Sequence, residues 1–291
     1  MCGNAAVFKP ASDTPLCALM IVKILEKAGL PKGVVNFITG SGKDVGSSIV
    51  KNERIRGISF TGSREVGEFV MKNAGVKKVG LELGGKNAII IMDDADLGPA
   101  VDGVIWGAFG TTGQRCTATS RVIVSSKVIE KFKKMLISKM KTLRLGDGLR
   151  KTTDVGPLIN QAAVDKVNGY VMVGKDEGAK LAIGGTPAKV NGKGFFYKPT
   201  LFTDVSTDMR IAQEEIFGPV LSMIEVRGLD DAIDAANAVS YGLSSAIYTN
   251  DIRRAMVAVR SIEAGLVYVN SSTIGSCLLY TSDAADELDG V

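Results

Sequence analysis

Cys116 and Glu82 are the two side chains whose type and setting could do chemistry. Cys116 follows Gly113-Gln114-Arg115, so an arginine and a glycine stand close to it in the sequence. An electropositive, partly exposed setting makes a cysteine a nucleophile, although a buried structural cysteine is the alternative. Glu82 ends a β-rich run before two glycines, where a carboxylate can act as a general base or simply lie at the surface. The local sequence leaves both alternatives open.

The composition excludes several kinds of catalytic and binding site. The 291 residues include no histidine, which rules out Ser-His-Asp triads, Cys-His dyads and histidine-ligated metals. The four cysteines form no Cys-x-x-Cys pair, the net charge is only +4, and no apolar run approaches eighteen residues. We therefore expect no metal, no nucleic-acid partner and no membrane span. The amino-terminal residues lack a signal-peptide pattern, which predicts a cytoplasmic protein.

The elements that must position these residues alternate between β-rich and helical patterns. In the first third the patterns predict helices near Asp13–Ala28, at Lys43–Lys51 and at Arg64–Asn73. The predicted strands are Ala5–Lys9, Val34–Thr39, Gly57–Thr61 and Val79–Leu83. This order predicts a parallel sheet with covering helices and a ligand crevice beyond the carboxyl ends of its strands.

A second α/β unit is predicted from about Gly85. Its first strand, Ala88–Met92, is wholly apolar and is therefore expected to be buried on both faces. Further strands are expected at Arg121–Ser125, Leu181–Ile183, Val220–Val226, Ala246–Tyr248 and Leu266–Asn270. The expected helices are Asp96–Phe109, Lys127–Leu143, Ala162–Glu177, Leu229–Val239 and Ile252–Ile262.

Three glycine clusters follow predicted strands. They are Gly40-Ser41-Gly42, Phe60-Thr61-Gly62-Ser63 and Glu82-Leu83-Gly84-Gly85. Glycine lets a backbone approach a ligand, and a helix amino end favours a phosphate, but tight turns use glycine without any ligand. The first cluster is not a P-loop, because Asp44 stands where Ser or Thr is needed and Phe37 where a glycine is needed.

Taken together, these motifs resemble the NAD(P)-dependent aldehyde dehydrogenase superfamily. Glu82–Lys86 resembles its glutamate signature and Gly113–Cys116 its cysteine signature. Phe8–Ala11, Phe60–Ser63 and Glu214–Pro219 resemble its adenosine-side loop, its pyrophosphate turn and its second cofactor loop. The resemblance runs from about Gly3 to about Ser276. It implies an aldehyde-dehydrogenase-like α/β fold, with a partial Rossmann-like cofactor domain at 1–84 and an α/β catalytic domain at 85–276.

The resemblance also implies roles for single residues. Cys116 would attack the aldehyde and Glu82 would activate water. NADP or NAD would be bound by Lys9, Ser12, Gly40, Thr61, Gly62, Ser63, Leu83, Gly84, Glu215 and Phe217. Lys9 could instead be a solvated charge and Phe217 a core aromatic. Ser12 stands where NAD-preferring members carry a glutamate that repels a 2′-phosphate, so we expect NADP to be accepted.

The resemblance implies oxidation of an aldehyde to a carboxylate. Gly113–Arg121 and Ser271–Ser276 are similar to members acting on semialdehydes such as 2,5-dioxovalerate or aminoadipic semialdehyde. Arg115 could attract a substrate carboxylate or only support its loop. A CoA-acylating relative is the first alternative, although Glu82 argues against it. A non-catalytic protein with this fold is the second.

Both ends of the sequence depart from the family pattern. Family members carry a longer amino-terminal portion with a Trp-Asn-x-Pro-like motif, whose asparagine is an oxyanion donor, and this sequence has no such motif. From Cys277 to the end, 277–291, the sequence resembles no family segment and is interpreted as an artefactual tail. We therefore expect an impaired fragment of an enzyme that forms homo-oligomers.

Overall fold

The computed structural model describes residues 3–275, and the described chain divides into two compact units between Leu81 and Glu82. Cys2, Cys277 and the predicted tail therefore lie outside the described residues. The helices of the first unit are α1 (Pro15–Lys27), α2 (Ser47–Lys51) and α3 (Arg64–Asn73), with a π-helical turn, η1 (Gly42–Gly46), before α2. Its strands are β1 (Ala6–Phe8), β2 (Val35–Phe37), β3 (Gly57–Thr61) and β4 (Lys78–Glu82).

The first unit does not form the single sheet predicted from its alternating pattern. β1 pairs with β2 in parallel, with Phe8 opposite Phe37, and β3 pairs with β4 in a separate two-stranded sheet. The prediction was wrong because alternation of strands and helices does not determine which strands become neighbours. Around β3, β4 and α3 a small apolar core forms, whereas α1 leaves large side chains exposed, namely Leu16, Met20, Ile21 and Ile24.

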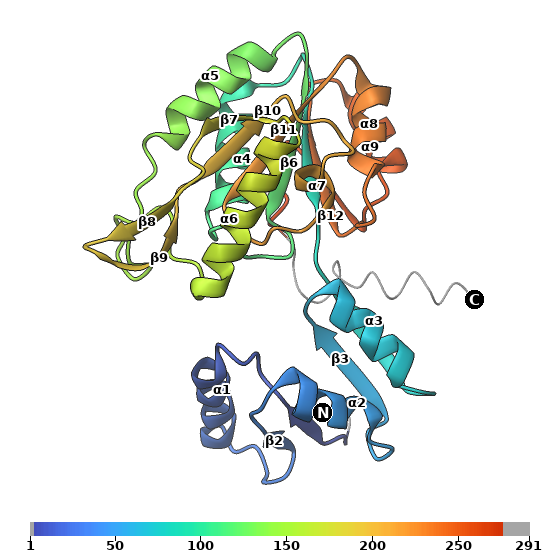
Figure 1. Cartoon of the computed structure of the whole chain (residues 1–291). Helices are drawn as coiled ribbons and strands as arrows, with labels where there is room; N and C mark the ends of the chain where they lie inside the picture. The colour runs from blue at the N-terminus through green and yellow to red at the C-terminus, as the bar shows by residue number, and fades with distance from the viewer. Residues whose placement is uncertain (1–2, 276–291) are drawn as a thin grey trace. The chain divides into compact units, whose positions relative to one another are not determined.

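The second unit is built on a seven-stranded sheet in the order β13-β12-β5-β6-β11-β10-β7. Every neighbouring pair is parallel except β10 and β7, which confirms the predicted α/β class. The strands are β5 (Asn87–Ile91), β6 (Thr119–Ser125), β7 (Lys180–Ile183), β10 (Thr200–Thr203), β11 (Val220–Val226), β12 (Ser244–Tyr248) and β13 (Leu266–Val269). A hairpin of β8 (Pro187–Val190) and β9 (Lys193–Tyr197) leaves this sheet, as Figure 1 shows.

Helices cover both faces of this sheet. The five helices involved are α4 (Leu97–Phe109), α5 (Ile129–Met140), α6 (Gln161–Asp176), α8 (Leu229–Asn237) and α9 (Ile252–Ser261), and α7 (Arg210–Gln213) is a single turn. α4 and α5 pack with Ile89 and Ile91 on one face, whereas α6, α8 and α9 pack with Ala88 and Ile90 on the other (Figure 1). The apolar run of β5 is therefore buried on both sides, as its sequence predicted. No helix of the described residues is long and apolar enough to cross a membrane.

The loops that carry the candidate residues of this unit lie at the amino ends of its parallel strands. Lys86 immediately precedes β5, Cys116 precedes β6, and Glu215 precedes β11. At the carboxyl ends, Asp94 after β5 accepts hydrogen bonds from the Thr249 hydroxyl at 2.8 Å and from the Asn250 N–H at 3.0 Å. These hydrogen bonds join the turns that follow β5 and β12.

Arg121 ties the amino-end rim to the helical layer. Its Nε donates to the carbonyl of Lys86 at 2.8 Å, and its two Nη atoms donate to Ala235 and Ala236 at 2.7 and 2.8 Å. Ala235 and Ala236 lie in the last turn of α8, whose carbonyls have no partner within the helix. Burial lowers the pKa of Arg121 to about 10, so the guanidinium stays charged at neutral pH.

Replacing Arg121 with methionine is expected to lower the free energy of unfolding by about 3–5 kcal/mol, because three buried carbonyls lose a charged donor. Urea unfolding at neutral pH measures the effect. Arg144→Met is the matched control, since Arg144 pairs with Asp154 at the surface, where an ion pair adds little stability. Equal effects of the two substitutions would contradict the role given to Arg121.

Candidate active site

Asn87, the first residue of β5, fixes the loop that carries Cys116. The Nδ2 of its buried amide donates to the carbonyls of Cys116 and Ala118 at 2.7 and 2.9 Å. Its Oδ1 accepts from the backbone N–H of Ser244 at 3.1 Å. One amide therefore satisfies three backbone groups and joins the cysteine loop to the first residues of β5 and β12. Sequence reasoning missed Asn87, because no local pattern reveals these partners.

The loop before Cys116 is held from its other side by a second set of hydrogen bonds. Gln114 donates to the carbonyl of Pro157 at 3.2 Å and accepts from the N–H of Ile159 at 2.9 Å. The hydroxyl of Thr112 donates to the carbonyl of Gly156 at 3.2 Å. Thr112 itself has a positive φ of 57°, a conformation that costs free energy in a β-branched residue. These contacts offset that cost and fix the loop.

Three glycines allow the site's backbone segments to meet. A Cβ at Gly113 would collide with the carbonyl of Gly218, and one at Gly84 would collide with the carboxylate of Glu215. A Cβ at Gly85 would lie 2.6 Å from the carbonyl oxygen of Cys116. The glycines of the predicted glutamate and cysteine signatures are thus required by close packing within the protein, whatever ligand they meet.

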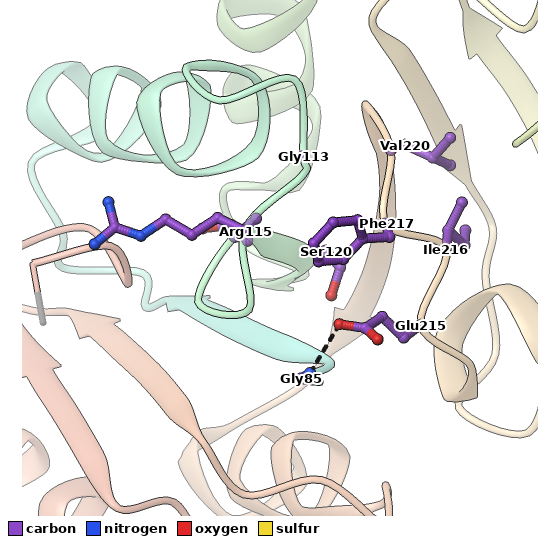
Figure 2. A pocket seen from close by; sticks show the side chains of 11 residues that line it. Gly85, Gly113, Arg115, Ser120, Glu215, Ile216, Phe217 and Val220 are labelled. Carbon is purple, nitrogen blue, oxygen red and sulfur yellow. Dashed lines mark hydrogen bonds between the residues drawn. The ribbon is translucent and has the colours of Figure 1, made fainter. Parts of the chain in front are cut away.

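Glu215 and Phe217 line a pocket beside the cysteine loop. In Figure 2 the Glu215 carboxylate points toward Gly85, whose N–H donates to Oε1 at 3.1 Å. The pocket spans about 290 Å³, partly open to solvent, and its lining includes Gly113, Ser120 and Val220. Phe217 has a positive φ of 58° and is 42% exposed, so the alternative of a core aromatic is wrong. The Arg115 side chain extends away from Glu215 in Figure 2.

Cys116 is half-buried, and its thiol is within electrostatic reach of Glu82. Burial raises the pKa of the Cys116 thiol, and the negative charge of Glu82 raises it further. A hydrogen bond from the Thr117 backbone and the positive charge of Arg115 oppose the increase in this pKa. The thiol is therefore mostly protonated at neutral pH. The Cys116 side chain is partly exposed and is not a core residue. The roles of Cys116 as nucleophile and of Glu82 as base stay predictions.

Replacing Glu82 with glutamine is expected to speed alkylation of Cys116 by iodoacetamide at pH 8 by about twofold, since loss of a like charge lowers the thiol pKa. In both proteins the rate should rise with pH through the raised pKa, because only the thiolate reacts. Mass spectrometry of the labelled peptides measures it. The exposed Cys17 provides an internal control whose rate should not change. A slower reaction at Cys116 would contradict the electrostatic coupling.

Lys86 is a second buried residue that the sequence analysis did not single out. Its place directly before the apolar run of β5 was the signal that could have indicated its burial. Its side chain is 1% exposed, and its Nζ has no hydrogen-bond partner within the described protein. Burial and, to a smaller extent, the charge of Arg121 lower the pKa of Lys86 to about 7, while Glu215 and Glu214 oppose the decrease. Below about pH 7 the folded protein thus carries a costly buried cation, which lines a small cavity with Arg121 and Tyr241.

Lys86→Met is expected to increase the free energy of unfolding by about 1–4 kcal/mol at pH 6, because the buried charge disappears. Between pH 7 and about 10.4 the lysine is protonated in the unfolded chain but neutral in the folded one, so the free energy of unfolding of the wild type rises with pH. The difference in this free energy between Lys86→Met and the wild type therefore becomes smaller. Urea unfolding at pH 6 and 9.5 measures it. The exposed Lys166→Met is the control, and a pH-independent difference would contradict the depressed pKa.

Predicted cofactor residues of the first unit form their own contacts. The Lys9 Nζ donates to the carbonyls of Pro10 and Gly40 at 2.7 and 3.4 Å, so Lys9 is not merely a solvated charge. The Ser63 hydroxyl accepts from the Val66 N–H at 3.4 Å and caps α3. The remaining predicted positions are the exposed Ser12, Thr61 and Gly62 and, in the second unit, the partly buried Leu83.

Similarity to known proteins shows the family to which the chain belongs. The model of the aldehyde dehydrogenase family matches residues 1–279. The chain belongs to this family. It is 46% identical over 277 residues to 2,5-dioxopentanoate dehydrogenase of Saccharolobus solfataricus and 43% identical over 278 residues to alpha-ketoglutaric semialdehyde dehydrogenase of Bacillus subtilis. Each alignment covers 94% of this chain and 57% of the relative, so the chain spans little more than half the length of these aldehyde dehydrogenases.

A solved structure of the same family is similar over nearly the whole chain. Betaine aldehyde dehydrogenase from Staphylococcus aureus, in complex with NAD⁺, is 38% identical with a TM-score of 0.90. The match covers 92% of this chain and 54% of that one. The similarity confirms the aldehyde-dehydrogenase-like fold that the sequence motifs implied.

Proposed function

We propose that this chain carries the catalytic residues of an NAD(P)-dependent aldehyde dehydrogenase that oxidises a semialdehyde such as 2,5-dioxovalerate to a carboxylate. The observation that carries the proposal is the half-buried Cys116 thiol, fixed through Asn87 and acted on by the charge of Glu82. This pairs a nucleophile with a carboxylate base, as a protein without histidine requires. Two relatives are named for this semialdehyde, which supports the substrate class.

The reaction follows from the chemistry of the two side chains. The Cys116 sulfur, once deprotonated, forms a bond to the aldehyde carbon and gives a thiohemiacetal oxyanion, which the Cys116 N–H would stabilise. Loss of hydride from that carbon leaves a thioester, and NAD(P)⁺, when bound, supplies the hydride acceptor. Glu82 then takes a proton from water, whose oxygen adds to the thioester carbon. The carbon–sulfur bond breaks, releasing the acid and the Cys116 thiolate.

The residues for the cofactor have suitable donor and acceptor chemistry. Glu215 presents a carboxylate, held by the Gly85 N–H, that would bind the nicotinamide ribose hydroxyls, with Phe217 nearby. The capped amino end of α3, with Gly62 and Ser63, would suit the pyrophosphate, and Lys9 the adenosine ribose. Ser12 is small and uncharged, so a 2′-phosphate would be tolerated and NADP⁺ accepted as well as NAD⁺.

The test measures formation of the reduced cofactor by the purified chain with 2,5-dioxovalerate and with betaine aldehyde, using NADP⁺ and NAD⁺ in turn. We expect oxidation of 2,5-dioxovalerate without CoA, loss of the reaction in Cys116→Ser, and a decrease of about 10²–10⁴ in Glu82→Gln. Cys17→Ser, which changes an exposed cysteine of the first unit, is the matched control. Activity that survives Cys116→Ser, or that needs CoA, would contradict the proposal.

A further inference from the structure

The turn that carries Glu215 and Phe217 needs support from neighbouring elements. It runs irregularly from the end of α7 to the start of β11, and Figure 2 shows both side chains on it. Phe217 has a positive φ of 58°, a conformation that costs free energy in any residue with a side chain. Such a turn keeps its shape only where surrounding contacts hold it. These contacts therefore decide where the two pocket residues lie.

Glu214, the first residue of this turn, binds two side chains. Arg210 donates to its carboxylate oxygens at 2.8 and 3.0 Å, and the Tyr170 hydroxyl donates to Oε2 at 2.7 Å. Arg210 is the first residue of α7, so its exposed ion pair would move together with the turn and adds little stability. Tyr170 lies on α6. The Tyr170 hydroxyl is therefore the donor that ties Glu214 to a different element.

α6 is a firm support for this hydrogen bond. One face of the helix is buried in a core of the second unit, and Val167 on that face also contacts the turn, because a Cβ at Gly218 would collide with the Val167 side chain. Glu177, the residue after α6, accepts a hydrogen bond from the Arg210 N–H at 3.0 Å. The α6 segment thus holds the start of α7 through Glu177 and the turn after α7 through Tyr170.

The Tyr170 hydroxyl stays protonated and so remains a donor at neutral pH. Burial raises the pKa of Tyr170 to about 12, and the hydrogen bond to Glu214 raises it as well. Hydrogen bonds from Arg210 and, to a smaller extent, from Tyr170 lower the pKa of Glu214, so its carboxylate is ionised. A hydrogen bond from a hydroxyl to a charged carboxylate is stronger than one between neutral groups.

We propose that Tyr170 is a positioning residue: through Glu214 it fixes the turn that holds the Glu215 carboxylate at the Gly85 N–H and Phe217 in the wall of the pocket. The part that concerns Gly85 is independent of the proposed function. The second part, that Tyr170 thereby sets the affinity for the cofactor, rests on the proposed function, since it takes Glu215 as the ligand of the nicotinamide ribose.

The first test measures amide hydrogen exchange at Gly85 in the whole chain at pH 7, by mass spectrometry with single-residue resolution. Tyr170→Phe removes only the hydroxyl, and we expect Gly85 to exchange about tenfold faster, as for loss of one hydrogen bond to a charged group. Tyr197→Phe is the matched control, because Tyr197 donates to Asn168, which is also on α6. Equal exchange at Gly85 in Tyr170→Phe and the wild type would overturn the proposal, as would an equal effect of the control.

A double-mutant cycle separates positioning from a general loosening of α6. If the Tyr170 hydroxyl acts through Glu214, Tyr170→Phe has no further effect on Gly85 exchange once Glu214→Ala has removed the acceptor. Glu214→Gln, which keeps an acceptor oxygen, should restore part of the slow exchange of the wild type. Additive effects of Tyr170→Phe and Glu214→Ala would mean that the hydroxyl acts elsewhere, and the proposal would fail.

A second measurement connects the turn to the cofactor. The dissociation constant for NADPH, followed by its fluorescence, should be about threefold higher in Tyr170→Phe, because affinity falls with the fraction of molecules whose turn is in place. Tyr197→Phe should bind NADPH like the wild type, and Tyr170→Phe should have no further effect in Glu215→Ala. NADPH binding that is equal in Tyr170→Phe and the wild type, or absent in both, would overturn the cofactor part alone.

Discussion

The buried amide of Asn87 is the interaction on which the rest of the candidate site depends. It satisfies two carbonyls of the cysteine loop and one backbone N–H of β12, three groups that would be costly to bury unpaired. Because the loop is irregular, no ladder of strand hydrogen bonds could hold it in register. The position of Cys116 relative to the sheet therefore rests on side-chain hydrogen bonds, from Asn87 on one side of the loop and from Thr112 and Gln114 on the other.

Close backbone packing around Asn87 makes charged side chains in the site unfavourable. Gly84, Gly85 and Gly113 bring backbone segments to distances that any side chain would prevent. Burial in this packing raises the pKa of the Cys116 thiol and lowers that of Lys86. The site thus keeps both groups closer to neutrality than they would be in water, at a cost that the two well-packed cores of the second unit offset.

The sequence predicted those helices and strands that a local pattern of apolar residues can encode. The apolar run at Ala88–Met92 predicted a buried strand, which the structure confirms. The roles that the motif resemblance gave to Cys116, Glu82 and Glu215 stay predictions. The sequence could not predict Asn87, because its partner Ser244 is 157 residues away and nothing local marks the pair. The strands β8, β9 and β10 were not predicted, because their short sequences show no clear alternation of apolar and polar residues. The single sheet predicted for the first unit was wrong, because strand order is not local information and β1–β2 and β3–β4 form separate sheets.

The arrangement of loops around the sheet of the second unit has an evolutionary consequence. Cys116 and Glu215 are carried by turns entering the strands, whereas the turns leaving β5 and β12 are joined by Asp94 and Thr249. Substitutions in the turns that leave β5 and β12 can thus change the thermal stability of the unit while the loops of the candidate site keep their geometry. Adaptation to temperature and adaptation to a new ligand would act on opposite edges of one sheet.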